Sequence, residues 1–177
     1  MSERVRKEIF EWIKVFALAI VFAFIITQFI KPTLVRGESM YSTLEEGDYL
    51  IINRMSYKFK EPQRGDIIVF ESDLQQEDGT NKDLVKRVIG VGGDRVKIED
   101  SIVYVNGEEI AEPYIHDEVT DGDVDTVVPE GCVFVLGDNR DISLDSRYEQ
   151  VGFVEESDIL GKVFVRLYPF NKIGLLG

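Results

Sequence analysis

The sequence contains few of the residue types on which several protein functions depend. It has one cysteine, Cys132, so no intrachain disulfide can form, and the apolar run that follows indicates a small buried side chain rather than a reactive thiol. The single histidine, His116, is expected in a loop, and it leaves a histidine-based triad as a remote alternative. A serine nucleophile in this chain would more plausibly pair with a lysine, which is a known variant of that chemistry.

Positive charge is also scarce. The chain has 20 Lys and Arg against 33 Asp and Glu, a formal net charge of −13. This balance argues against a nucleic-acid partner, because neutralising phosphates requires Lys and Arg. The charge is uneven: residues 1–36 carry +3, and the remaining residues carry −16. A basic end beside an acidic body suits contact with anionic membrane lipid.

One long apolar run lies near the N-terminus. Residues 15–30 contain only two polar side chains, Thr27 and Gln28, and residues 10–14 extend the run to 21 residues. A helix needs about 20 residues to cross a bilayer. We therefore predict a transmembrane helix over residues 10–31, ended by Pro32, which cannot continue the helical hydrogen bonds.

Two other readings of this run are weaker. A cleavable signal peptide would need small residues just after the apolar core, but the chain has bulky ones there. A buried core helix would not need to be apolar all round. More Lys and Arg precede the run than follow it, so we expect residues 1–9 in the cytoplasm and residues 32–177 outside it, a single-pass protein of the cell membrane.

The rest of the chain reads as short strands separated by turns. The strand-like segments are residues 49–52, 67–70, 84–89, 96–98, 102–105, 133–136 and 162–167. Asn106-Gly107 and Gly92-Gly93-Asp94 are turn signals, and residues 155–160 could form one helical turn. The predicted fold is mostly β, one antiparallel domain that forms a partly closed barrel or a sandwich.

Two polar stretches interrupt the strands. Residues 71–83 are expected to form a solvated surface loop. Residues 121–125 resemble the start of a calcium loop, but that loop needs Gly at its sixth position and Glu at its twelfth, where this chain has Thr126 and Cys132. An acidic loop is the better interpretation, and we expect no metal and no cofactor.

Ser39 and Lys86 are the candidate catalytic pair. Strand alternation places Lys86 on one face with Leu84 and Val88, so its ammonium would be desolvated and its pKa lowered, as a lysine general base requires. Ser39 follows the apolar helix closely and could give its proton to such an amine. On spacing alone, a solvated edge residue of a strand is the favoured interpretation of Lys86, and the alternative for Ser39 is a turn or cap hydroxyl.

Four motifs occur together and in order: residues 39–48, 64–70, 86–94 and 137–147. With the apolar helix and the C-terminal residues 168–174, this set resembles the bacterial type I signal peptidases, the Ser-Lys endopeptidases that remove signal peptides from exported proteins. The resemblance covers nearly the whole chain. Each motif alone is weak evidence, but the ordered set is highly specific.

The resemblance implies a role for particular residues. Ser39 would be the acyl-accepting nucleophile and Lys86 the general base. Ser143 would hydrogen-bond and orient the lysine, and Asp145 and Arg147 would support the site, although by themselves they could be a surface ion pair of small energetic value. Shallow pockets for small side chains at the −1 and −3 positions of an Ala-Xaa-Ala type signal peptide would be lined by Val35, Met40, Leu44, Leu84 and Val85.

This chain departs from the family pattern at two prolines, which are replaced by Ser42 and Gly92. Each change would reduce the rigidity of its own loop, and Ser42 lies in the loop that holds Ser39. Gly37 stands where some members have a hydroxyl that binds the oxyanion, so oxyanion stabilisation would rest on backbone N–H groups such as that of Ser39. Two other classes remain as alternatives: a cytosolic self-cleaving repressor type of Ser-Lys peptidase, and a catalytically silent, membrane-anchored β module that binds partners.

Overall fold

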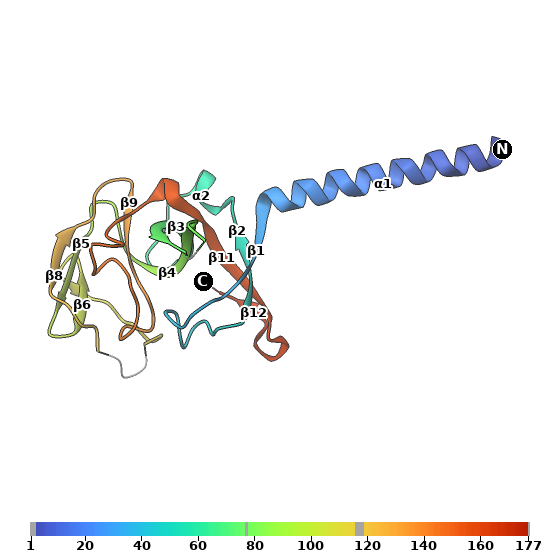
Figure 1. The fold of residues 1–177 in the computed structure, drawn as a ribbon. Coiled ribbons are helices and arrows are strands. Elements are labelled where there is room, and N and C mark those ends of the chain that lie inside the picture. Colours follow the sequence, from blue (N-terminus) through green and yellow to red (C-terminus); the bar gives the residue numbers. More distant parts are fainter. Residues whose placement is uncertain (1–2, 77, 116–118, 177) are drawn as a thin grey trace.

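The computed structural model describes residues 3–76, 78–115 and 119–176. Its first element, α1 (Glu3–Phe29), projects away from the β-rich body, and none of its residues is buried (Figure 1). By length and composition this helix could cross a membrane. The helix begins earlier than predicted and ends at Phe29, before Pro32. Pro32 lies instead in an edge strand, where its missing N–H costs no sheet hydrogen bond.

The body is built on one large antiparallel sheet with the strand order β1-β2-β11-β3-β4-β9-β10, in which β12 pairs with β11. Within the described residues the two end strands, β1 and β10, do not pair with each other, so the sheet is open. Its strands are β1 (Ile30–Leu34), β2 (Tyr49–Asn53), β3 (Ile67–Gln75), β4 (Asn81–Val91), β9 (Cys132–Leu136), β10 (Val154–Glu155), β11 (Ile159–Tyr168) and β12 (Gly174–Leu175). Three one-turn helices accompany them, α2 (Ser56–Phe59), η1 (Glu156–Asp158) and η2 (Phe170–Lys172).

A second, smaller antiparallel sheet lies at the end of the body farthest from α1 (Figure 1). Its order is β7-β6-β5-β8, with the strands β5 (Arg95–Glu99), β6 (Ile102–Val105), β7 (Glu108–Glu109) and β8 (Val124–Val127). Asn106 and Gly107 both have positive φ, 56° and 84°, and form the two-residue turn between β6 and β7. The prediction of a mostly antiparallel β fold behind one apolar helix is confirmed.

Alternate residues of β3 and β4 are buried in different apolar clusters. Ile68, Leu84 and Val88 belong to one cluster, whereas Val69 belongs to another, against which Val85 packs. This is the period of two that a strand buried on both faces requires. Lys86 lies in this part of β4 and is therefore surrounded by protein rather than by water.

The segment 71–83 differs from its prediction. It is not a simple loop, because β3 and β4 continue through most of it as a hairpin in which Glu71 pairs with Asp83 and Ser72 with Lys82. The Ser72 hydroxyl also donates a hydrogen bond of 2.7 Å to the Lys82 carbonyl. Sheet pairing depends on main-chain hydrogen bonds to a neighbouring strand, and the polar composition of this segment did not indicate that neighbour.

Candidate active site

Ser39 lies in the loop between β1 and β2. The ends of this loop are held together because the Val35 N–H donates to the Asp48 carbonyl at 2.9 Å and the Gly47 N–H donates to the Val35 carbonyl at 3.1 Å. Met40, next to Ser39, is 2% exposed and packs in an apolar cluster of the core. Ser39 is thus a half-buried residue on a closed and well-anchored loop.

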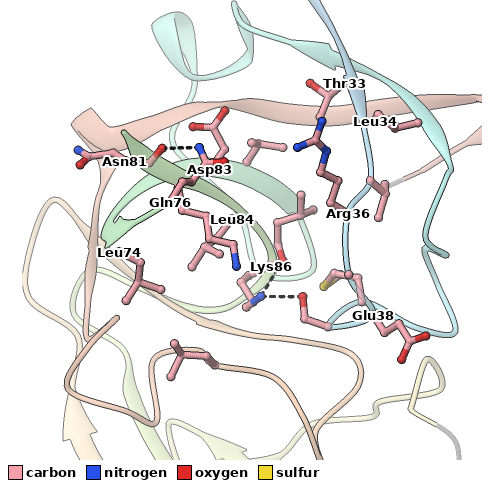
Figure 2. Close-up of a pocket in the computed structure, with 18 of the residues that line it drawn as sticks. Thr33, Leu34, Arg36, Glu38, Leu74, Gln76, Asn81, Asp83, Leu84 and Lys86 are labelled. Carbon is pink, nitrogen blue, oxygen red and sulfur yellow. Dashed lines mark hydrogen bonds between the residues drawn. The ribbon is translucent and has the colours of Figure 1, made fainter. Parts of the chain in front are cut away.

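Lys86 reaches this loop from β4. Its backbone pairs with Ile68 of β3, and only 2% of the residue is exposed. Its ammonium nitrogen donates hydrogen bonds to the Ser39 hydroxyl at 2.8 Å and to the Val85 carbonyl at 3.1 Å (Figure 2). The structure therefore brings together the two residues that the sequence analysis paired, although 47 positions separate them in the chain.

The surroundings of Lys86 favour its neutral form. Burial lowers the pKa of Lys86 from its ordinary value of 10.5 to about 8, since removal from water penalises the ammonium. The carboxylate of Asp145 acts in the opposite direction, and the positive charge of Lys82 adds to the lowering. Near neutral pH a useful fraction of this lysine is therefore an unprotonated amine that can accept a proton.

The loop of residues 137–147 lies against the Ser39 loop. The Asn139 N–H donates to the Ser39 carbonyl at 3.1 Å, and the Ser143 N–H donates to the Asn139 carbonyl at 3.1 Å. Ser143 is 2% exposed, and its hydroxyl has no hydrogen-bond partner within the part of the chain that the structure describes. The expected hydrogen bond between Ser143 and Lys86 is thus not formed in this conformation, in which Lys86 contacts Ser39 and Val85 instead.

Asp145 and Arg147 form a buried ion pair, not a surface one. Their side chains are 0% and 2% exposed, and the Arg147 Nε lies 2.8 Å from an Asp145 oxygen. The other Asp145 oxygen accepts the Gly137 N–H at 3.0 Å, and Arg147 donates to the carbonyls of Arg140 and Ser143. The pair therefore ties the two ends of the 137–147 loop together.

Gly137 has no room for a side chain. A Cβ built on it would lie 2.1 Å from the Ser143 hydroxyl and 2.4 Å from the Ser39 carbonyl oxygen. The glycine allows the two loops to approach closely, and a larger residue would push Ser39 or Ser143 out of place.

An open cleft of about 480 Å³ leads to Ser39 and Lys86 (Figure 2). Four residues expected to line the substrate pockets do line it: Val35, Met40, Leu84 and Val85. Leu44 is fully buried, and packs with Val35 and Met40 in the core rather than lining the cleft. Apolar wall residues to which the sequence analysis gave no role are Leu34, Val69, Leu74, Ile142 and Leu144.

No group of three or more acidic, cysteine or histidine side chains within the described residues could hold a metal ion. In the acidic segment 121–125, Asp125 forms an ion pair with Arg95 at 2.7 Å. His116 lies outside the residues that the structure describes.

The sequence analysis missed several buried charged residues next to the site. Arg87, which follows the candidate base, forms a two-pronged ion pair with Asp138 at 2.8 and 2.6 Å, and Arg140 is paired with Glu112. Their residue types alone gave no signal, because Arg, Asp and Glu are usually exposed. Arg87, Asp138 and Arg140 lie inside two of the four motifs, which could have drawn attention to them, whereas Glu112 lies outside all four.

Three comparisons place these observations among known proteins. Residues 9–168 match the model of the family described as signal peptidase, peptidase S26. The chain is 38% identical to signal peptidase IB of Staphylococcus aureus strain COL, covering 94% of this chain and 93% of that protein. It is 42% identical to signal peptidase I of Bacillus caldolyticus, covering 78% of this chain and 80% of that protein.

A solved structure is also similar, the crystal structure of a signal peptidase I from Enterococcus faecalis V583. It is 36% identical, with a TM-score of 0.48, and the match covers 58% of this chain and 97% of that one.

A serine and a buried lysine in hydrogen-bond contact on an antiparallel β domain are consistent with a serine peptidase. The family model spans most of the chain, and the relatives are well above 30% identical over most of their length. The chain belongs to the signal peptidase family, peptidase S26. Membership of this family supports the cleavage of signal peptides from preproteins by a serine peptidase.

Proposed function

We propose that this protein is a membrane-anchored endopeptidase that cleaves signal peptides after a small residue, with Ser39 as nucleophile and Lys86 as general base. One observation carries the proposal: the nitrogen of a buried lysine, whose pKa is lowered to about 8, lies 2.8 Å from the Ser39 hydroxyl. That distance permits direct proton transfer, and the lowered pKa makes the amine available to accept the proton.

The reaction would proceed in two halves. The Lys86 amine takes the Ser39 proton as Oγ attacks the carbonyl carbon of the scissile peptide, and the resulting ammonium then protonates the leaving amine. This step leaves an acyl-enzyme on Ser39. Lys86 next takes a proton from a water, whose oxygen attacks the ester. The bond to Oγ then breaks, the ammonium returns the proton to Oγ, and the signal peptide leaves with its new carboxylate. Among the described residues the Ser39 N–H donates no hydrogen bond, so it is free to stabilise the oxyanion in both halves.

The hydrogen-bonding capacity of a neutral amine supports a role for Ser143. Neutral Lys86 has one lone pair and two N–H groups, and the lone pair must face the Ser39 hydroxyl to accept its proton. The Val85 carbonyl accepts one N–H, as it does in the structure. The buried, unpartnered Ser143 hydroxyl could accept the other, which would fix the direction of the lone pair. We therefore retain Ser143 as the orienting residue, and Asp145 and Arg147 as the pair that supports its loop.

The cleft suits an extended peptide with small side chains. Val35, Met40 and Val85 present apolar surface beside Ser39, and a small residue at −1 or −3 would fill such shallow pockets without displacing their walls. We propose signal peptides of secretory preproteins as substrates, with the Ala-Xaa-Ala type preferred. The proposed mechanism needs no cofactor or metal, and the acidic body disfavours nucleic acid.

The helix α1 would place this chemistry at the membrane surface. Nine residue steps separate Ile30 from Ser39, and an extended chain of that length reaches at most roughly 30 Å. We propose that α1 spans the membrane once, with the N-terminus in the cytoplasm and the body on the extracytoplasmic side, in contact with membrane lipid. A substrate whose apolar segment lies in the bilayer would present its cleavage site at a similar height.

Neither rival function accounts as well for these features. A cytosolic self-cleaving repressor would have no use for an exposed apolar helix such as α1. A silent binding module would have no need to keep a buried lysine in contact with a serine hydroxyl, since burial of that amine is unfavourable.

Cleavage of a defined peptide tests the proposal directly. We expect the full chain, purified in detergent, to cut a peptide that carries an Ala-Xaa-Ala sequence once, after the second Ala, as identified by the masses of the two products. A matched peptide with Leu in place of both alanines is expected to remain intact, because Leu does not fit shallow pockets. Equal cleavage of both peptides would contradict the proposed specificity, and no cleavage of either would favour the binding module.

Substitution of Gly137 tests the close approach of the two loops. Gly137→Ala is expected to lower the unfolding free energy by about 1–3 kcal/mol, because the added methyl group overlaps Ser143 and the Ser39 carbonyl. The same displacement is expected to lower kcat on the order of 100-fold. Urea unfolding and peptide cleavage measure the two effects. Gly174→Ala is the control, since a Cβ there meets nothing within 4 Å, and a wild-type kcat for Gly137→Ala would contradict the packing argument.

A further inference from the structure

A buried ion pair joins the segment between β7 and β8 to the 137–147 loop. Glu112 and Arg140 have side chains that are 8% and 0% exposed, and both guanidinium ends of Arg140 contact the Glu112 carboxylate, one of them at 3.0 Å. The Arg140 Nε donates to the Gly137 carbonyl at 3.0 Å, and its Nη1 also donates to the Thr120 hydroxyl at 2.5 Å. The guanidinium thus lies between a carboxylate from one segment and the backbone of the loop that contacts Ser39.

Tyr114 makes a second connection from the same segment. Its hydroxyl donates to the Glu112 carboxylate at 2.8 Å, and its ring centroid lies 3.9 Å from the Arg87 guanidinium. Arg87 holds Asp138, the neighbour of Gly137, with two hydrogen bonds. Burial and the Glu112 carboxylate raise the pKa of Tyr114, so its hydroxyl stays protonated and remains a donor. Glu112 and Tyr114 therefore contact the loop through two arginines.

The loop that they contact determines where Ser39 sits. Gly137 packs against the Ser39 carbonyl, and the Asn139 N–H donates to the same oxygen. A change in the position of residues 137–139 would therefore be transmitted to the backbone of the nucleophile. Arginine cannot lose its proton to escape an unpaired buried state, so loss of the Glu112 charge would force Arg140 to find another partner or to move.

We propose that Glu112 and Tyr114 are positioning residues for the reaction. They hold the 137–147 loop, and through it Ser39, at the position where the Ser39 hydroxyl contacts the Lys86 nitrogen. They lie outside the four motifs and outside the cleft, and they act only through Arg140 and Arg87. This inference rests on the proposed peptidase function for its kinetic consequences, but the positioning of the loop can be measured without any substrate.

The test compares Glu112→Gln with wild type in the full chain. Glutamine keeps the size of the side chain but removes the charge that balances Arg140. We expect kcat for the Ala-Xaa-Ala peptide to fall between about 10-fold and 100-fold, because a small displacement of the nucleophile is costly. KM is expected to change little, since neither Glu112 nor Arg140 is among the residues that line the cleft. Glu112→Asp, which keeps the charge, is expected to recover much of the lost kcat.

Amide hydrogen exchange gives the readout that does not depend on activity. In Glu112→Gln the amide protons of Asn139 and Ser143, which donate to the Ser39 and Asn139 carbonyls respectively, are expected to exchange faster than in wild type. Glu109→Gln is the matched control, because Glu109 is an exposed glutamate on β7 of the same region. It is expected to leave both kcat and the two exchange rates unchanged.

Several outcomes would overturn the inference. A Glu112→Gln variant that folds and has the wild-type kcat would overturn it. A variant whose kcat falls only in step with a lowered Tm, while the amides of Asn139 and Ser143 keep their exchange rates, would overturn it as well. If Glu112→Gln does not fold, Tyr114→Phe takes its place as the test variant, because it removes only the hydrogen bond to Glu112 and keeps the ring on Arg87. An unchanged kcat in Tyr114→Phe would also overturn the inference. If wild type itself cleaves nothing, the proposed function fails, and the exchange rates alone still decide whether Glu112 positions the loop.

Discussion

Ser39→Ala is expected to abolish peptide cleavage, with kcat/KM lowered by on the order of 10⁴-fold or more. Alanine removes the only atom that can form the acyl bond, and the hydrogen bond from Lys86 at 2.8 Å has no acceptor left. What remains is the binding cleft and the backbone donor of the oxyanion, which together accelerate hydrolysis only weakly. The measurement is the initial rate of product formation in detergent, followed by mass spectrometry.

Trapping of the acyl group distinguishes loss of the nucleophile from loss of the fold. Hydroxylamine added to wild type during turnover is expected to divert part of the N-terminal product into a hydroxamate, because it competes with water for the ester on Ser39. Ser39→Ala should give no hydroxamate while keeping the wild-type Tm. Ser157→Ala, which alters an exposed serine of η1, is the control and is expected to keep full activity. Turnover by Ser39→Ala at more than a trace rate would contradict the assignment of the nucleophile.

Lys86→Met is expected to lose activity as completely as Ser39→Ala, and yet not to lose stability. Methionine is an unbranched apolar side chain of similar length, and replacing a buried charge with apolar atoms is often neutral or stabilising. Cleavage should fall by on the order of 10⁴-fold because the substitution removes the amine that contacts the Ser39 hydroxyl and would accept its proton. Lys86→Arg should be equally inactive up to high pH, since a guanidinium does not deprotonate. Activity retained in either variant would exclude Lys86 as the base.

The pH profile of wild type tests the same residue without substitution. Burial lowers the pKa of Lys86 to about 8, so kcat/KM is expected to rise with pH and to reach half its maximum near pH 8. The unfolded chain has the ordinary value of 10.5, so between pH 8 and 10.5 the unfolded state binds more protons than the folded one. The contribution of Lys86 to stability therefore increases across that window, and Lys86→Met should remove this increase. A rate that falls between pH 7 and 9 would contradict the proposed role.

The periodicity of the sequence predicted most of the fold. The apolar run before Pro32 predicted the long helix α1, and apolar segments such as residues 67–70 and 84–89 predicted strands where β3 and β4 lie. These signals are local, because burial of one helix stripe or one strand face is encoded in residues a few positions apart. The polar hairpin of residues 71–83 and the entry of Pro32 into β1 were missed. The hairpin depends on pairing between its own two polar arms, and β1 depends on β2, which lies beyond the Ser39 loop; neither pairing is recorded in apolar periodicity.

The features of the candidate site also fall into those that the sequence indicated and those that only the structure revealed. Ser39 and Lys86 could be singled out from residue type and local environment, and the ordered motifs indicated Ser143, Asp145 and Arg147. Their burial could not be read from the sequence: Asp145 and Arg147 have the composition of a surface ion pair but lie in the interior. The connection of Glu112 to the Gly137 backbone through Arg140 had no local signal at all.

The sequence by itself thus determined the class of the fold, the apolar helix and the chemical identity of the two residues at the centre of the site. Only the tertiary structure decided that the Lys86 nitrogen lies 2.8 Å from the Ser39 hydroxyl and that Leu44 belongs to the core rather than to the cleft. The physical reason is that periodicity records which face of an element is buried, whereas a pKa or a proton-transfer distance depends on which distant segments pack together there. For Lys86 those segments are the Ser39 loop and strand β3.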